Sequence, residues 1–259
     1  AELKGDAATA AWCVEQSQIV GKVIDEHAWD GQWFIRGISA TGAALGSAAA
    51  EEGRIYLEPN VWAVISGVTS PEQARTAMDS VHEHLATEHG VELCNPPHTK
   101  SMPGIGLSLL VFPPGHKENG GIFCHANSWA VVAEAMLGRG QRSYDYYRSY
   151  LPARYEDSAE VHQTEPYVYA QFTHGSFSPR FGQSRNSWLT GTASWTYVAV
   201  TQYLLGIKPV LEGLRIDPAI PSAWDGYEVR RRFRGAWVTV KVSNPEHVET
   251  GVRSLSVDG

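Results

Sequence analysis

Residues 186–195 have the sequence Asn-Ser-Trp-Leu-Thr-Gly-Thr-Ala-Ser-Trp, in which small hydroxyl and glycine residues lie between two tryptophans. The apolar spacing that follows predicts a helix over residues 193–205. Thr190, Gly191 and Thr192 would present backbone N–H groups and hydroxyls at the N-terminus of this helix, where its partial positive charge favours a phosphate-like ligand. Most helix caps bind nothing, but the flanking indole rings suit a sugar. The segment therefore predicts a helical fold and raises phosphate-dependent carbohydrate chemistry above a generic globular domain.

Further helices are predicted from apolar spacing and end signals. They cover residues 6–27 with Asp6 as N-cap, 70–90 with a capping box and proline at the first helical position, 125–137, and 143–150. After Gly206, residues 227–229 and 237–242 alternate like strands. The sequence therefore predicts a mainly α chain. We expect helical hairpins around a central cleft, as in an α/α barrel, over residues 1–208, and a small β segment over residues 209–259.

The charge balance argues against nucleic acid or an anionic membrane as the partner. The formal net charge is -7 at pH 7. The basic residues cluster in a strand-like segment whose alternation sends side chains to both faces, so structural, solvated charge is the favoured interpretation. The cluster consists of Arg230, Arg231, Arg232 and Arg234.

The cysteines Cys13, Cys94 and Cys124 have neither the number nor the spacing of a disulfide framework or a zinc ribbon. Such usage fits a reducing compartment, and we expect a cytoplasmic location. No apolar run reaches the roughly 18 residues that a spanning helix needs, and no signal peptide is visible. The chain begins without methionine and stops within a β region, so we expect a partial sequence.

Residues 115–129, Gly-His-Lys-Glu-Asn-Gly-Gly-Ile-Phe-Cys-His-Ala-Asn-Ser-Trp, concentrate charged, amide and imidazole groups in a glycine-rich loop that enters a helix. His125 is a candidate phosphate ligand, while Lys117 and Glu118 are candidate partners of sugar hydroxyls. A capped helix with a hydrogen-bonded histidine is the simpler interpretation of the same residues.

Residues 165–171, Glu-Pro-Tyr-Val-Tyr-Ala-Gln, alternate a carboxylate, two phenols and an amide along an extended segment. Gln171 could donate a hydrogen bond to a phosphate oxygen. The alternative is a strand or loop whose tyrosines pack against helices.

Other catalytic patterns fail. Gly-x-Ser-x-Gly, a Walker loop and His-Glu-x-x-His do not occur in the sequence. His82, His84 and His89 share a predicted helix, but the first two point to different faces, so no metal site is expected there. Asp30 and Glu58 are carboxylates in aromatic loops, and either is a candidate acid.

Four motifs occur together and in order, at residues 113–129, 165–171, 186–195 and 205–209. This set, which covers nearly the whole chain, resembles cellobiose phosphorylase and its relatives in glycoside hydrolase family 94. The resemblance implies a cytoplasmic, usually homodimeric inverting phosphorylase with an (α/α)6 barrel followed by a small β layer. Such enzymes cleave a β-linked disaccharide with inorganic phosphate, without a further cofactor, and give α-glucose 1-phosphate and free sugar.

By the same resemblance, the phosphate would be held by His125, Gln171, Thr190 and Gly191, with Lys117 and Glu118 lining the sugar subsites. An inverting scheme with phosphate needs one carboxylic acid and no base, because phosphate is already an anion. In the family that acid is an aspartate in an Asp-Trp-Asn-Asp type motif, which this chain does not contain. We therefore expect the C-terminal part of the barrel, lacking the general acid and with little or no turnover in isolation.

The sugar specificity has several possible answers. Cellobiose is the favoured substrate, although the loop over residues 99–110 has Ser108 near the place where a cellobiose enzyme carries an acidic residue. Relatives that act on diacetylchitobiose, laminaribiose or cellobionic acid share much of the pattern, as does the phosphorylase-like domain of cyclic glucan synthases.

Two alternatives of other classes stay open. One is a carbohydrate-binding or scaffold domain that stacks sugars on its tryptophans and binds no phosphate. The other is a glycoside hydrolase of the same barrel type, which would need two carboxylates about 6.5–9.5 Å apart if it is inverting.

Overall fold

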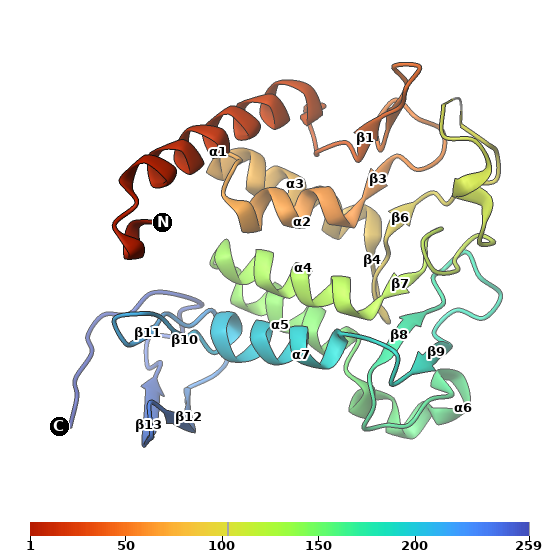
Figure 1. The fold of residues 1–259 in the computed structure, drawn as a ribbon. Coiled ribbons are helices and arrows are strands. Elements are labelled where there is room, and N and C mark those ends of the chain that lie inside the picture. The colour runs from red at the N-terminus through yellow and green to blue at the C-terminus, as the bar shows by residue number, and fades with distance from the viewer. Residues whose placement is uncertain (103, 259) are drawn as a thin grey trace.

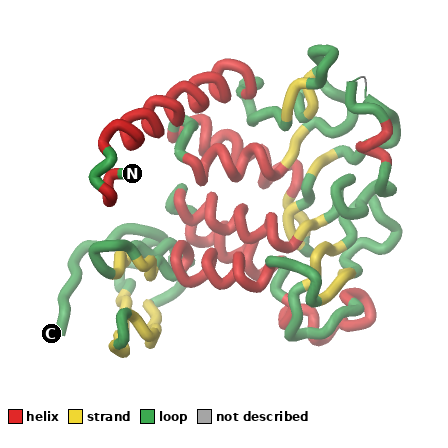
Figure 2. The backbone as a smooth tube through the Cα atoms, in the orientation of Figure 1, coloured by secondary structure: helices red, strands yellow, loops and turns green. Residues whose placement is uncertain are grey.

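Helices α2, α4 and α7 lie side by side and run in the same direction in a computed structural model that describes residues 1–102 and 104–258 (Figure 1). Loops and short strands gather at the end where these helices begin (Figure 2). Pro103, in the predicted acceptor loop, and Gly259, at the end of the predicted β segment, lie outside the described residues. The α-helices are α1 (Ala7–Ala28), α2 (Leu57–Ser66), α3 (Pro71–Leu85), α4 (Cys124–Met136), α5 (Gly140–Ser149), α6 (Ala159–His162) and α7 (Thr192–Val198).

The strands are short and form small antiparallel sheets. The three-stranded sheet has the order β7-β8-β9, and β12 pairs with β13 in the longest hairpin. The strands are β1 (Gly37–Ile38), β2 (Ala44–Leu45), β3 (Ile55–Tyr56), β4 (Ala86–Thr87), β5 (Gly90–Val91), β6 (Cys94–Asn95), β7 (Ile122–Phe123), β8 (Ala170–Thr173), β9 (Ser184–Ser187), β10 (Ile207–Pro209), β11 (Leu214–Ile216), β12 (Gly226–Phe233) and β13 (Ala236–Ser243). The order of helices and strands confirms the expectation of a mainly α chain with a β segment near its end.

Helix α3 begins as its sequence predicts. The Ser70 hydroxyl accepts a hydrogen bond from the backbone N–H of Gln73, whose side chain accepts one from the backbone of Ser70, so the predicted capping box is present. The predicted stop at Gly90 is wrong, because the helix ends at Leu85 and the chain turns into the β4-β5 hairpin. The Asn127 side chain bonds both the N–H and the carbonyl of Val91, and this tertiary contact holds the hairpin in place.

His89 therefore lies outside α3, and the prediction that it shares a helix with His82 and His84 is wrong. The His89 ring packs against Tyr155 and Phe181, with ring centroids 5.2 and 4.8 Å apart. Burial lowers the pKa of His89, so it is an uncharged packing residue at neutral pH.

The helix predicted over residues 193–205 is regular only in its first part. Helix α7 passes into a π-helix at Ala199–Leu204. Within this stretch the Thr201 hydroxyl donates to the carbonyl of Tyr197 at 2.6 Å, and such a bond competes with the regular backbone pattern. The helix begins at Thr192, one residue before the predicted start, so its N-terminal end lies where the sequence predicts.

The hydrophobic core fills the space between α2, α3 and α4, where Leu57, Met78 and Leu85 are almost completely buried. Three buried hydroxyls then join the helices that flank α4. Ser128 lies 3.1 Å from Tyr150 and 3.0 Å from Thr196, and the last two are 3.1 Å apart. Helices α4 and α7 therefore have a fixed spacing, maintained through a phenol that follows α5.

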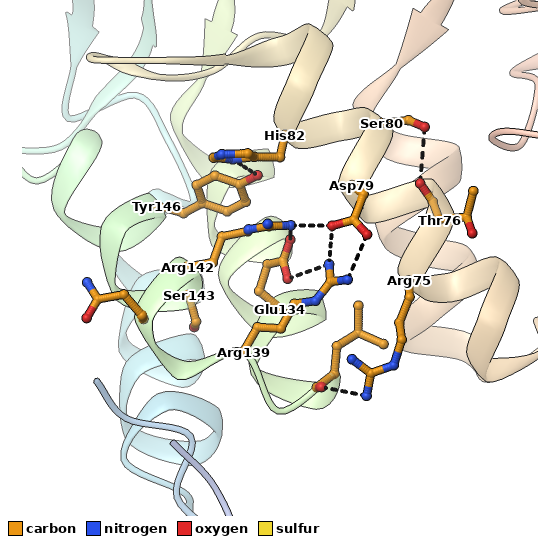
Figure 3. Close-up of polar contacts among 12 residues, drawn as sticks. Arg75, Thr76, Asp79, Ser80, His82, Glu134, Arg139, Arg142, Ser143 and Tyr146 are labelled. Atoms are coloured by element: carbon orange, nitrogen blue, oxygen red, sulfur yellow. Dashed lines mark hydrogen bonds and ion pairs between the residues drawn. The ribbon is translucent and has the colours of Figure 1, made fainter. Parts of the chain in front are cut away.

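A polar network joins α3 to α4, to α5 and to the turn between them (Figure 3). Asp79 lies 2.9 Å from Arg139 and 2.7 Å from Arg142, and both arginines also face the fully buried carboxylate of Glu134. Beside them the Tyr146 hydroxyl lies 3.1 Å from His82 Nδ1. These contacts link α3 and α5 to α4.

The basic cluster of β12 contributes to the C-terminal β segment. Arg231 donates to the carbonyl of Ile207 at 2.9 Å, and the Arg230 guanidinium lies 4.8 Å from the centre of the Trp237 ring. Helix α1 is different, because the predicted Asp6 cap is present but none of its residues is buried. In the part of the chain that the structure describes, no helix has both the length and the apolar character needed to cross a membrane.

Candidate functional site

The β7-β8-β9 sheet brings together segments that are distant in the sequence. Phe123 of β7 pairs with Phe172 of β8, and Ala170 of β8 pairs with Ser187 of β9. Strand β7 leads directly into α4, β8 carries Gln171, and β9 leads into the loop before α7 (Figure 1). Three of the predicted motifs therefore meet at the end where α4 and α7 begin.

Gln171 is tied to the loop that carries Thr190. Its Nε2 donates to the carbonyl of Leu189 at 3.4 Å, and its Oε1 accepts a hydrogen bond from Asn186 at 3.0 Å. The Thr190 hydroxyl lies 2.6 Å from the Thr192 hydroxyl and accepts from the Thr192 backbone N–H. Gly191, the N-cap of α7, is exposed. Gln171, Thr190 and Gly191 thus belong to one surface segment.

His125 occupies the first turn of α4. Its half-buried ring lies 5.5 Å from Phe123 and 5.0 Å from Trp129, measured between ring centroids. Burial lowers the pKa of His125, so the imidazole is neutral at pH 7 and donates through one nitrogen. No hydrogen-bond partner of this imidazole occurs among the residues described, which disfavours the simpler interpretation of a structurally satisfied histidine.

Backbone hydrogen bonds and close packing fix the conformation of the loop that carries Lys117 and Glu118. Lys117 has a φ of 46° and its carbonyl accepts from the Gly121 N–H at 2.9 Å, while a Cβ on Gly121 would meet the Lys117 nitrogen at 2.5 Å. The Asn119 side chain bonds the backbone of His98 on both sides. The Lys117 ammonium lies over the ring of Phe112, 5.3 Å from its centre.

A cavity of about 310 Å³ lies where α2 and α4 begin. It joins His125 with Glu118, which sequence reasoning had assigned separately to phosphate and sugar. Lys117, Gln171, Thr190 and Gly191 are not part of its wall. The lining residues are Arg36, Glu58, Trp62, Leu93, Glu118, Phe123, His125, Ala126 and Trp129.

The tryptophans of the inner helices form a ladder beside this cavity. The ring centroids of Trp62 and Trp129 are 5.3 Å apart, and those of Trp129 and Trp195 are 5.8 Å apart. Trp195 was predicted as a sugar platform, whereas Trp62 and Trp129 were not assigned to the site. Trp129 lies in a predicted apolar helix, where a core position was the natural expectation, and Trp62 lies in α2, which was not predicted.

The two candidate acids are not free carboxylates. Asp30 accepts from the backbone N–H groups of Trp33 and Ala48, at 3.3 and 2.7 Å, and so closes a loop. Glu58 lies in the first turn of α2 and forms an ion pair with Arg36 at 2.9 Å. Glu58 was expected in a loop, and Arg36 was missed because its partner is distant in the sequence.

The described residues include no cluster suited to a metal ion. Within residues 1–102 and 104–258 no group of three or more His, Cys, Asp or Glu side chains is placed to hold a metal ion. The cysteines beside the site are buried, and burial raises the pKa of the Cys94 and Cys124 thiols to about 12. They are therefore neutral packing residues.

Helices α2, α4 and α7 run in the same direction, and polar and aromatic residues gather where they begin. The chain is therefore an α-helical domain with a candidate binding site at that end. Comparison with family models identifies it. Residues 1–206 match the model described as "Glycosyl hydrolase 94 superfamily, catalytic domain", and residues 210–255 match "Glycosyl hydrolase family 65, C-terminal domain". The chain therefore belongs to the glycosyl hydrolase 94 superfamily.

Its relatives include disaccharide phosphorylases. The chain is 43% identical to N,N'-diacetylchitobiose phosphorylase of Vibrio proteolyticus over 95% of its own length and 31% of the relative's. It is 33% identical to solabiose phosphorylase of Paenibacillus borealis over 100% of its own length and 34% of the relative's. It is 34% identical to cyclic beta-(1,2)-glucan synthase NdvB of Rhizobium meliloti, over 85% of its own length and 8% of the relative's. The chain thus spans about a third of the length of the two phosphorylases.

Proposed function

We propose that this chain is the phosphate-binding part of an inverting disaccharide phosphorylase. It would correspond to the C-terminal part of an (α/α)6 barrel over residues 1–208, followed by a β segment over residues 209–259. The reaction would convert a β-linked disaccharide and inorganic phosphate into α-glucose 1-phosphate and free sugar. The observation that carries the proposal is His125, a neutral imidazole with no hydrogen-bond partner among the described residues, which follows the strand β7 that pairs with the Gln171 strand β8.

In this mechanism the chain's residues bind and orient phosphate. His125 and the second N–H of the Gln171 amide would donate to its oxygens, and the Thr190 hydroxyl and the Gly191 backbone would complete the seat. A phosphate oxygen then forms a bond to the anomeric carbon while the glycosidic bond breaks on the opposite face. The departing oxygen takes its proton from a carboxylic acid that this chain does not supply, so the isolated chain should have little turnover.

The sugar side of the proposal rests on Glu118 and Lys117. Glu118 lines the cavity that His125 also lines, where it would accept hydrogen bonds from sugar hydroxyls, and Lys117, which is not among the lining residues, would donate after leaving the Phe112 ring. Cellobiose is the disaccharide that the motif pattern favours, and the relatives' names make diacetylchitobiose and solabiose the substrates to compare with it. We also propose that the phosphorylase of which this chain would be a part is a homodimer.

The test is phosphate-dependent thermal stabilisation of the 259-residue chain at constant ionic strength. A ligand at about 100 times its Kd stabilises the folded state by about 2.7 kcal/mol, so the midpoint should rise with phosphate concentration. His125→Ala should remove the rise, whereas His27→Ala, an exposed histidine on α1, should keep it. A chain stabilised by sugar but not by phosphate would instead be a carbohydrate-binding domain.

A second candidate is the phosphorylase-like domain of a cyclic glucan synthase. The similarity to the Rhizobium meliloti protein favours it. The two candidates share the phosphate seat and differ in the length of the glucan that reaches it. Stabilisation of the phosphate-bound chain by a linear β-1,2-glucan, but not by cellobiose, would favour the synthase domain.

A further inference from the structure

The negative charges that line the 310 Å³ cavity outnumber the positive charges. Arg36 and Glu58 form an ion pair at 2.9 Å, with side chains 42% and 25% exposed. Glu118 has no ion-pair partner among the described residues, and His125 is neutral at pH 7. The cavity therefore has a net negative charge, because Glu58 neutralises Arg36, the guanidinium found among its described lining residues.

The paired oxygen of Glu58 depends on Arg36. It is buried and has no hydrogen-bond partner within residues 1–102 and 104–258, apart from this ion pair. Burial raises the pKa of Glu58, Arg36 opposes this change, and the nearby charge of Glu118 adds to it. The two carboxylates are thus close enough to interact, and a further anion would meet both of them.

The other nearby cation is directed elsewhere. The Lys117 ammonium lies 5.3 and 5.6 Å from the ring centres of Phe112 and Phe172, and Lys117 is not among the residues that line the cavity. A phosphate in the cavity would therefore meet excess negative charge without a free cation. A neutral sugar would meet acceptors for its hydroxyls and the rings of Trp62 and Trp129 for its apolar faces.

We propose that the Arg36–Glu58 pair is a specificity element that separates the two substrates. It keeps the cavity at the start of α2 and α4 for uncharged sugar hydroxyls and confines phosphate to the Thr190–Gly191 side of His125. This inference rests on the proposed function. It assigns to Glu58 the task of suppressing an anion site that Arg36 would otherwise create.

The experiment compares inorganic phosphate binding to the wild-type chain and to Glu58→Gln by equilibrium dialysis at about pH 7.5 and constant ionic strength. Glutamine keeps the shape of Glu58 and frees the Arg36 charge. Phosphate affinity should rise about tenfold, the size expected for removing one negative charge a few ångströms from a partly exposed site. The double variant Arg36→Gln/Glu58→Gln should return the affinity to the wild-type value.

Glu118→Gln provides a second measurement if Glu58→Gln does not fold, because Glu118 is exposed. It should also raise phosphate affinity, by less than Glu58→Gln since it frees no cation. Unchanged phosphate affinity in folded Glu58→Gln would overturn the inference, as would unchanged affinity in Glu118→Gln where that is the variant that folds. If phosphate still stabilised His125→Ala, while Glu58→Gln raised the phosphate affinity as expected, the result would count against the proposed phosphate seat and not against this inference.

Discussion

Replacing Glu134 by glutamine should stabilise the chain at alkaline pH and leave its stability almost unchanged at acidic pH. The Glu134 side chain is 0% exposed, and its nearest cationic groups, Arg139 and Arg142, lie at 3.5 and 3.7 Å (Figure 3). Both arginines make shorter contacts with Asp79. Glu134 is thus a buried carboxylate whose partners are already engaged.

The magnitude follows from the pKa of Glu134. Burial raises this pKa from its ordinary value of 4.5 to about 7, against the attraction of Arg139 and Arg142. Between these values the folded chain holds a proton that the unfolded chain has lost, so the stability from this group is complete below pH 4.5 and is lost as pH rises through about 7. At about 1.4 kcal/mol for each pH unit between the two values, the loss amounts to roughly 3.5 kcal/mol.

Glutamine mimics the protonated acid and does not titrate, so it should remove this loss. Urea unfolding of the wild type and Glu134→Gln, from about pH 5 to about pH 8, gives the difference in the free energy of unfolding. Other groups cancel in that difference, including His162 and His174, whose pKa values burial lowers to about 4. A difference that stays constant with pH, or a variant less stable than the wild type at pH 8, would refute the reasoning.

The matched control is Asp79→Asn, which removes a carboxylate from the same network. Burial alone would raise the pKa of Asp79, but hydrogen bonds from Arg142 and Arg139 lower it below its ordinary value. Its side chain is 54% exposed, so its loss should destabilise the chain by only about 1 kcal/mol. The two variants of one network should therefore have opposite signs at pH 8.

Two further predictions concern stability. Ser70→Ala removes the N-cap of α3 and should lower the free energy of unfolding by about 1 kcal/mol, measured by urea denaturation, and no change would mean that Gln73 alone caps the helix. Tyr150→Phe leaves Ser128 and Thr196 bonded to each other but without the phenol, and should cost about 1–2 kcal/mol in the same assay. A neutral result there would show that the hydroxyl triangle does not fix the spacing of α4 and α7.

Local signals in the sequence predict the starts of α1 and α3, whereas α2 was not predicted and its Glu58 was expected in a loop. Asp6 and Ser70 mark helix starts because capping depends on neighbours within three residues, and both caps are present. The end of α3 could not be predicted in this way, because Asn127 pulls the chain into a hairpin from a helix that lies later in the sequence. Boundaries fixed by such tertiary contacts leave no local pattern.

The candidate site shows the same division. His125 and Glu118 attract attention in the sequence because glycines and polar groups surround them. Arg36 gives no such signal in the sequence. It becomes part of the site through its ion pair with Glu58, which forms only when the start of α2 is folded. Trp129 has the helical spacing of a predicted apolar helix and Trp62 lies in a helix that was not predicted, so their place in the cavity wall is visible only in three dimensions.

The tryptophan ladder gives the chain a built-in optical probe. Trp129 lies 5.0 Å from the His125 ring and 5.8 Å from Trp195, measured between ring centroids. Emission from indoles at such separations is shared among them and responds to a charged or hydrogen-bonded imidazole alongside. Intrinsic fluorescence should therefore register what happens at His125 in real time, without attaching a dye.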